Sequence, residues 1–173
     1  MHISVSDAVN LLSRTPQLLE DLLLDIPDAL LHANEGGDSW SPYDVVGHLI
    51  HGEKTDWIPR MKICLSDDNH KTFTPFDRFA QFEDSKGKSI LELLKTFRSL
   101  REENLTILND FQLSPADFER TAIHPAFGTV TLQQLLATWV VHDQNHIYQI
   151  TRTISHQYRE ETGPWKAYLR IIQ

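Results

Sequence analysis

Residues 131–157 of this chain read TLQQLLATWVVHDQNHIYQITRTISHQ. Apolar side chains recur in this stretch at spacings of three, four and seven, the pattern of a helix with one buried face. We therefore expect a long helix that begins at Thr131 and continues to about Gln157. Its buried face would consist of Leu132, Leu135, Leu136, Trp139, Ile147, Ile150 and Ile154.

Two histidines lie on the buried side of this helix. His142 follows Leu135 by seven residues, and His146 follows Trp139 by seven. Because the two histidines are four residues apart, they share one face and lie one helical turn from each other. Their imidazole nitrogens could therefore converge on a single divalent ion.

A third ligand must come from another helix, and His48 in Gly47-His48-Leu49 is the best candidate. Three protein nitrogens without a fourth ligand would leave a position open for water or substrate, as in catalytic metal sites. Burying three imidazoles is costly unless each is hydrogen-bonded or ligated. The alternative is a set of hydrogen-bonded core histidines, and spacing alone does not place His48 opposite the other two.

The rest of the chain is also helical in pattern, and four long helices with longer crossing connections predict a bundle. Thr15 would cap a restart within the first helix, Ser41 would cap the second, and Pro59 would kink it. A third long helix is followed by a restart near residue 113, and an aromatic-rich segment would pack over the bundle. The predicted helices span residues 6–26, 41–61, 89–111 and 131–157, the loops 27–40, 66–76 and 119–130, the aromatic segment 76–82, and a short terminal helix 166–171.

The composition limits the class of protein. A length of 173 residues favours one domain, residues 1–173, and an apolar fraction of 40% suits a globular chain. A net charge of −8 argues against nucleic acid or an anionic membrane as the main partner. The single cysteine, Cys64, fits a reducing compartment, and neither a leader nor a membrane-spanning run is evident. We therefore expect a cytoplasmic protein.

Several further residues have two interpretations each. Glu53 could accept a proton from a ligand imidazole or be an exposed helix residue. Asp143 and Gln149 could play that same role, although a surface cap or an interhelical hydrogen bond is favoured for both. His124 could reach the open coordination position, but an exposed loop histidine is favoured.

Cys64 could be a nucleophile or a metal ligand, but a thiol without function is favoured. Trp57, Trp139 and Tyr148 could line a substrate pocket, but core or dimer contacts are favoured. His51 is given no role.

Two segments resemble a known family. The stretch from Gly128 to Ile150 resembles the last bundle helix of the DinB/YfiT-like superfamily. Trp40-Ser41-Pro42, followed by Gly47-His48-Leu49 and Glu53, resembles the second helix of that family. The resemblance implies an all-α four-helix bundle of DinB/YfiT type with long crossing connections and a short C-terminal helix. It also implies a divalent metal ion, such as zinc, nickel or iron, held by His48, His142 and His146.

The same resemblance suggests functions. Members of the family include metal-dependent thiol S-transferases, so a small-molecule substrate or a low-molecular-weight thiol is an expected partner, and a homodimer is the expected assembly. A metal-dependent hydrolase is one alternative, and a non-catalytic metal-bearing binding or stress-response module is another. A zinc protease is disfavoured, because Asp143 stands where the His-Glu-x-x-His pattern has glutamate. The sequence assigns no catalytic residue.

Overall fold

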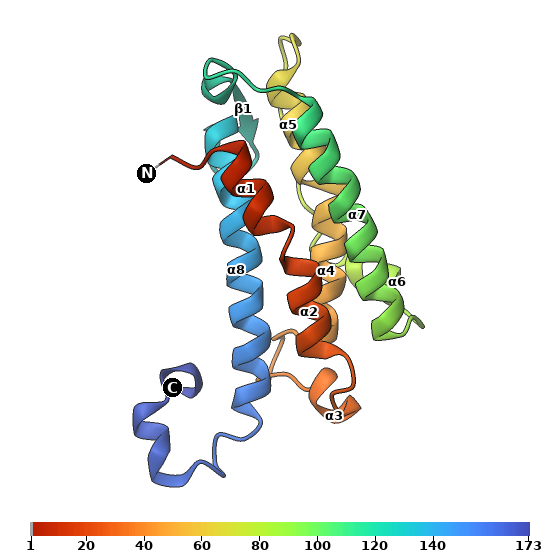
Figure 1. Cartoon of the computed structure of the whole chain (residues 1–173), viewed down its shortest axis with the longest axis vertical. Coiled ribbons are helices and arrows are strands. Elements are labelled where there is room, and N and C mark those ends of the chain that lie inside the picture. Colours follow the sequence, from red (N-terminus) through yellow and green to blue (C-terminus); the bar gives the residue numbers. More distant parts are fainter. Residues whose placement is uncertain (1) are drawn as a thin grey trace.

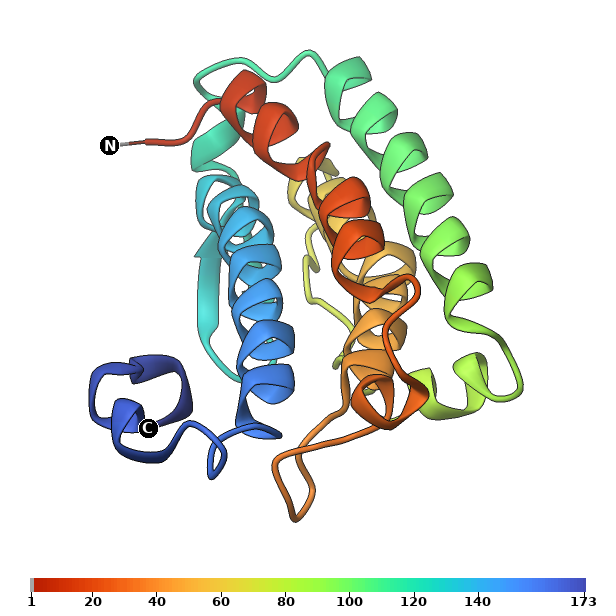
Figure 2. The same cartoon turned by 60° about the horizontal axis from the view of Figure 1, so that its bottom comes forward.

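The computed structural model describes residues 2–173 and shows a four-helix bundle (Figure 1). We call the four long helical segments of the bundle its arms. The first arm consists of two consecutive helices that pack against α7 (Ile90–Asp110) and α8 (Leu132–His156), and the second arm is likewise divided in two. Figure 2 shows the arms lying side by side from a second direction. The predicted fold class is therefore confirmed. In order, the arms are α1 (Val5–Leu12) with α2 (Thr15–Leu23), α4 (Pro42–Thr55) with α5 (Trp57–Leu65), α7 (Ile90–Asp110), and α8 (Leu132–His156).

Side-chain caps lie at the starts of all four arms, with Ser4 as the cap of α1. Ser41, Ser89 and Thr131 each accept a hydrogen bond from the backbone N–H three residues later. In each case the side chain three residues later bonds back to the backbone of the capping residue, which completes a capping box. These starts agree with the sequence prediction, because a capping box is encoded within four consecutive residues.

Two predictions about breaks within the arms are wrong in detail. Thr15 does not cap α2, because its hydroxyl instead donates a hydrogen bond of 2.6 Å to the Asp143 carboxylate. The second arm breaks at Asp56, between α4 and α5, and not at Pro59. Pro59 falls in the first turn of α5, where a backbone N–H has no partner within the helix and its loss costs little.

Residues 119–130, predicted as a loop, instead contain a short hairpin. Strands β1 (Thr121–His124) and β2 (Gly128–Thr131) pair antiparallel, and β2 leads directly into α8. The segment before α6 joins β1 as well, because Phe73 donates its backbone N–H to the carbonyl of Ile123 at 2.9 Å. Four-residue strands are too short to show a clear alternation of polar and apolar residues, which explains the missed prediction.

Short helical elements lie between the arms and after α8. The α6 helix packs closely on α4, since a Cβ atom on Gly47 would lie 2.5 Å from the Ser85 hydroxyl. The short helix predicted at residues 166–171 falls in a C-terminal region that forms two 3₁₀ helices. Within residues 2–173, no helix combines the length and the apolar character that crossing a membrane requires. These elements are α3 (Asp28–Leu31), α6 (Ala80–Ser85), η1 (Asp117–Glu119), η2 (Gly163–Tyr168) and η3 (Arg170–Ile172).

Two clusters of buried apolar side chains form the core. The α8 helix contributes Trp139 to one cluster and Ile150 to the other. His142 and His146 lie between these two residues along α8, so apolar packing on both sides fixes the part of the helix that carries them.

Candidate metal centre

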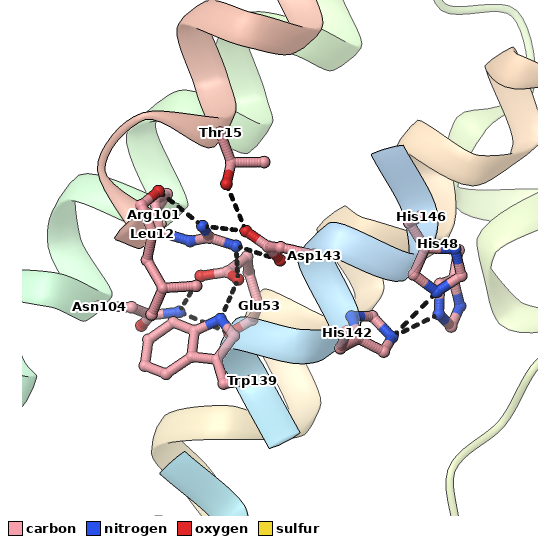
Figure 3. Close-up of polar contacts among 10 residues, drawn as sticks. All are labelled: Leu12, Thr15, His48, Glu53, Arg101, Asn104, Trp139, His142, Asp143 and His146. Atoms are coloured by element: carbon pink, nitrogen blue, oxygen red, sulfur yellow. Dashed lines mark hydrogen bonds and ion pairs between the residues drawn. The ribbon is translucent and has the colours of Figure 1, made fainter. Parts of the chain in front are cut away.

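The structure brings the three predicted histidines together from two helices. The Nε2 atom of His142 lies 3.0 Å from Nε2 of His48 on α4 and 3.1 Å from Nε2 of His146 on α8. The three potential ligand atoms all lie within 4.8 Å of one another, and Figure 3 shows the three rings converging. This group could hold a metal ion.

Hydrogen bonds alone do not satisfy this arrangement. His142 Nε2 faces two other Nε2 atoms, and a neutral imidazole carries only one proton to share between its two nitrogens. The Nδ1 atoms of His48 and His142 are buried without a hydrogen-bond partner. A cation that accepts one lone pair from each ring would satisfy all three Nε2 atoms together.

Burial keeps these rings neutral. It lowers the pKa of His48 to about 3 and that of His142 to about 2, with the neighbouring imidazoles adding to the effect. Burial also lowers the pKa of His146. Because a metal binds only the unprotonated nitrogen, the rings are ready as ligands at neutral pH without first losing a proton.

Glutamines lie beside two of the rings. Gln149 Oε1 is 2.8 Å from Nδ1 of His146, so Nδ1 donates its proton there and the lone pair of Nε2 faces the other histidines. Of the two roles considered for Gln149, the structure therefore shows contact with an imidazole of the triad. Sequence analysis missed Gln81 of α6, which is 1% exposed and has no hydrogen-bond partner for either atom of its amide. Burial lowers the pKa of His48, and the Gln81 amide partly opposes this effect.

A buried ion-pair network lies behind the histidines. Arg101 of α7 donates to Asp143 at 2.6 and 3.0 Å and to Glu53 at 2.8 Å. Burial disfavours the charge of Arg101, but the two carboxylates outweigh it and raise the pKa of the guanidinium. Asn104 donates to Glu53 at 2.9 Å, and the indole N–H of Trp139 donates to the same carboxylate at 3.1 Å.

The network corrects one interpretation and supports another. Glu53 does not accept a proton from a ligand imidazole, since five residues turn its side chain by about 140° around the helix from His48. Asp143 forms the expected interhelical hydrogen bonds. Figure 3 shows Asp143 directed toward Arg101, while the preceding His142 is directed toward the other two histidines.

A cavity of about 620 Å³ opens over the three rings. His48, His142 and His146 form part of its wall, together with aromatic and charged side chains from several segments. A small molecule that enters the cavity therefore reaches the face on which the imidazoles converge. The aromatic and charged residues of its wall include Trp40, Asp56, Arg60, Phe76, Arg78, His124 and Phe127.

The other residues considered in the sequence lie outside the triad. His51 is buried against Phe76, with ring centroids 4.9 Å apart, and is not part of the triad. Trp57 and Trp139 stack in the core at 5.6 Å. Cys64 is fully buried and burial raises the pKa of its thiol, in agreement with its assignment as a thiol without function.

Comparison with known proteins places this geometry in a family. A family model described as the DinB superfamily matches residues 11–150, which is most of the chain. The chain belongs to the DinB superfamily. All three histidines of the triad fall inside the matched region of this DinB superfamily chain.

Relatives and a solved structure agree with this assignment. A candidate metal-dependent hydrolase from Oceanobacillus iheyensis is 24% identical over 151 residues, which cover 87% of this chain and 86% of the relative. Another from Bacillus mycoides is 28% identical over 149 residues, which cover 85% and 79%. YfiT from Bacillus subtilis, described as a probable metal-dependent hydrolase with an unusual four-helix bundle topology, superposes with a TM-score of 0.74. That alignment covers 93% of this DinB superfamily chain and 90% of YfiT at 24% identity, and it shows a shared fold.

Proposed function

We propose that this protein is a metal-dependent hydrolase of small molecules. The observation that carries the proposal is a triad of neutral imidazoles, His48, His142 and His146, which converge at the wall of an open cavity. A divalent ion bound there would lower the pKa of a bound water and polarise the bond to be cleaved. The hydrolase names of the two curated relatives support the same class of reaction.

The residues of the chain have distinct parts in this proposal. The three histidines are neutral and direct their Nε2 atoms toward one another, and Gln149 fixes the tautomer of His146. The aromatic side chains of Trp40, Phe76 and Phe127 line the cavity and provide apolar surface for a substrate. Imidazole ligands suit zinc, nickel and iron alike, so the residues do not select among these ions.

The cavity also bears on the alternatives. A non-catalytic module would suit an ion enclosed on all sides, whereas this triad faces a space large enough for a small molecule. Thiol S-transfer, which the resemblance suggested, would use the same open position and stays a prediction. The cavity residues do not include the only cysteine, Cys64, so any thiol would have to be supplied by a small molecule.

Metal analysis and a paired activity assay test the proposal. Protein purified without an affinity tag should contain close to one divalent ion per chain and should hydrolyse an activated ester such as p-nitrophenyl acetate. His146→Ala should remove both the ion and the activity. His156→Ala, at the C-terminal end of the same helix and outside the cavity, should retain both.

Two outcomes would count against metal-dependent hydrolysis at the triad. Ester cleavage that persists in metal-free His146→Ala protein would show that the triad is not the reacting centre. Conjugation of a low-molecular-weight thiol to monochlorobimane by the metal-loaded protein, without cleavage of any ester, would instead favour thiol transfer.

A further inference from the structure

The cavity over the triad contains one positive charge without a partner. Arg78 lines the cavity, and no carboxylate among residues 2–173 lies within ion-pair distance of it. Arg60 is the other arginine in the wall, but it is paired with Asp56 at 2.8 Å. Arg78, whose side chain is exposed, is therefore the only arginine in the described cavity wall that forms no ion pair.

The local structure explains why Arg78 is left unpaired. The neighbouring carboxylate, Asp77, accepts hydrogen bonds from the backbone N–H groups of Phe79 at 2.9 Å and Ala80 at 3.2 Å. These bonds hold Oδ1 of Asp77 toward the backbone at the start of α6, and Asp77 forms no ion pair with Arg78. Arg78 also lies near the triad, because it lines the same cavity as His48, His142 and His146.

His124 adds a neutral donor to the same wall. Its Nδ1 atom accepts the backbone N–H of Ala126 at 3.1 Å, so the neutral ring carries its proton on Nε2. Burial and the nearby charge of Arg60 lower the pKa of His124 and favour this neutral form. The ring stacks on Phe127 with centroids 4.4 Å apart, which holds it in place at the cavity.

We infer that the substrate carries an anionic group, a carboxylate or a phosphate, on an aromatic or apolar body, and that Arg78 binds this group. This inference rests on the proposed function, because it takes the cavity over the triad as the substrate site. The aromatic residues Trp40, Phe76 and Phe127 bind the apolar body. The adjoining hollow of about 570 Å³ shares Trp40 and Arg78 but is also lined by Asp38 and Asp44, so the anionic group lies on the triad side.

Equilibrium binding to the metal-loaded protein tests the inference without any turnover. Isothermal titration compares phenylacetate and phenyl phosphate with the neutral phenylacetamide, which has nearly the shape of phenylacetate. At least one anion should bind about tenfold more tightly than the amide, as expected for a charge-assisted contact. Arg78→Met should reduce this preference by about tenfold, and Arg78→Lys should retain part of it.

Arg159→Met is the matched control, because it removes the same charge from an exposed position outside the cavity and should leave the preference unchanged. Equal binding of anions and amide by the unsubstituted protein would overturn the inference, as would an anion preference that survives in Arg78→Met. A preference for phenyl phosphate alone would identify phosphate esters as the class, and one for phenylacetate alone would identify carboxylates. The binding measurements need no turnover, so they remain valid if the protein does not hydrolyse esters. The two proposals can therefore fail separately.

Discussion

His142 is the central residue of the triad, because its Nε2 atom contacts the Nε2 atoms of both His48 and His146. Hydrogen bonds from neighbouring side chains determine which nitrogen of an imidazole ring is free to bind a metal ion. Gln149 orients one ring through a contact of 2.8 Å, whereas Nδ1 of His142 has no partner. Metal affinity should therefore depend on residues that never touch the ion.

Replacing Gln149 by leucine should weaken metal binding about tenfold, because His146 would lose the acceptor that fixes its tautomer. Competition titration of Zn²⁺ against a chromophoric chelator measures this change. Gln144→Leu, at an exposed position on the same helix, is the control and should bind as the unsubstituted protein does. Equal affinity in both variants would show that the contact has no influence on the ion.

The lowered pKa values of the triad also predict how stability depends on pH. Unfolded histidines titrate near pH 6.5, whereas folding lowers the pKa of His48 to about 3 and that of His142 to about 2, mainly through burial. Between these limits the unfolded chain binds more protons, so the free energy of unfolding should rise with pH up to about 6.5 and level off above it. Urea titrations of metal-free protein should show a loss of about 1 kcal/mol per pH unit for each histidine on acidification below that point.

A His142→Gln variant tests the origin of this slope. It should show a shallower dependence between about pH 6.5 and pH 5, since one of the titrating groups is gone. A profile equally steep in the variant would assign the effect to other groups.

Among the elements, α7 carries the residue that forms hydrogen bonds and ion pairs to the other three arms. Arg101 joins Glu53 of α4 to Asp143 of α8, and its guanidinium also donates to the carbonyl of Leu12 in α1 at 2.9 Å. The ion pairs are almost fully enclosed, with side-chain exposures of 1% or less. The network therefore holds the two helices that carry the triad at a fixed separation behind the metal-binding face.

Arg101→Met should lower the free energy of unfolding by about 3–5 kcal/mol, because it leaves two buried carboxylates without a counter-charge. Arg98→Met, one turn earlier on α7, removes a partly exposed pair with Glu20 and should cost less than about 1 kcal/mol. Chemical denaturation of both variants provides the comparison. Similar losses in the two would show that the enclosed network contributes no more than a surface pair.

At the scale of the whole molecule, the triad connects α4 to α8, so an ion bound there would stabilise the bundle as a unit. Zn²⁺ at a hundredfold excess over its dissociation constant should raise the free energy of unfolding by about 2.7 kcal/mol. Thermal unfolding with added metal and with a chelator measures the shift, and His48→Ala should abolish it. A melting temperature that does not respond to metal in the unsubstituted protein would contradict binding to the native state.

The expected homodimer also belongs to this scale. A mass in solution of twice the 20.0 kDa of one chain would support it. A mass equal to that of a single chain would rule it out under the conditions used.

Much of the fold could be predicted because its signals are local. Capping boxes at Ser41, Ser89 and Thr131 mark the helix starts within four residues, and a spacing of four places His142 and His146 on one face. The hairpin at residues 121–131 gave no such signal, because its short strands are held by pairing with each other and with residues 71–73.

The sequence by itself determined the helices, the faces on which their histidines lie, and the candidate ligands, since helical periodicity follows from backbone geometry alone. Only the tertiary structure decided that His48 meets the other two rings, that Glu53 pairs with Arg101 instead of an imidazole, and that a cavity opens over the site. These features depend on how α4, α7 and α8 pack across long separations in the chain. Such packing is settled by the fit of many side chains at once, which no local pattern records.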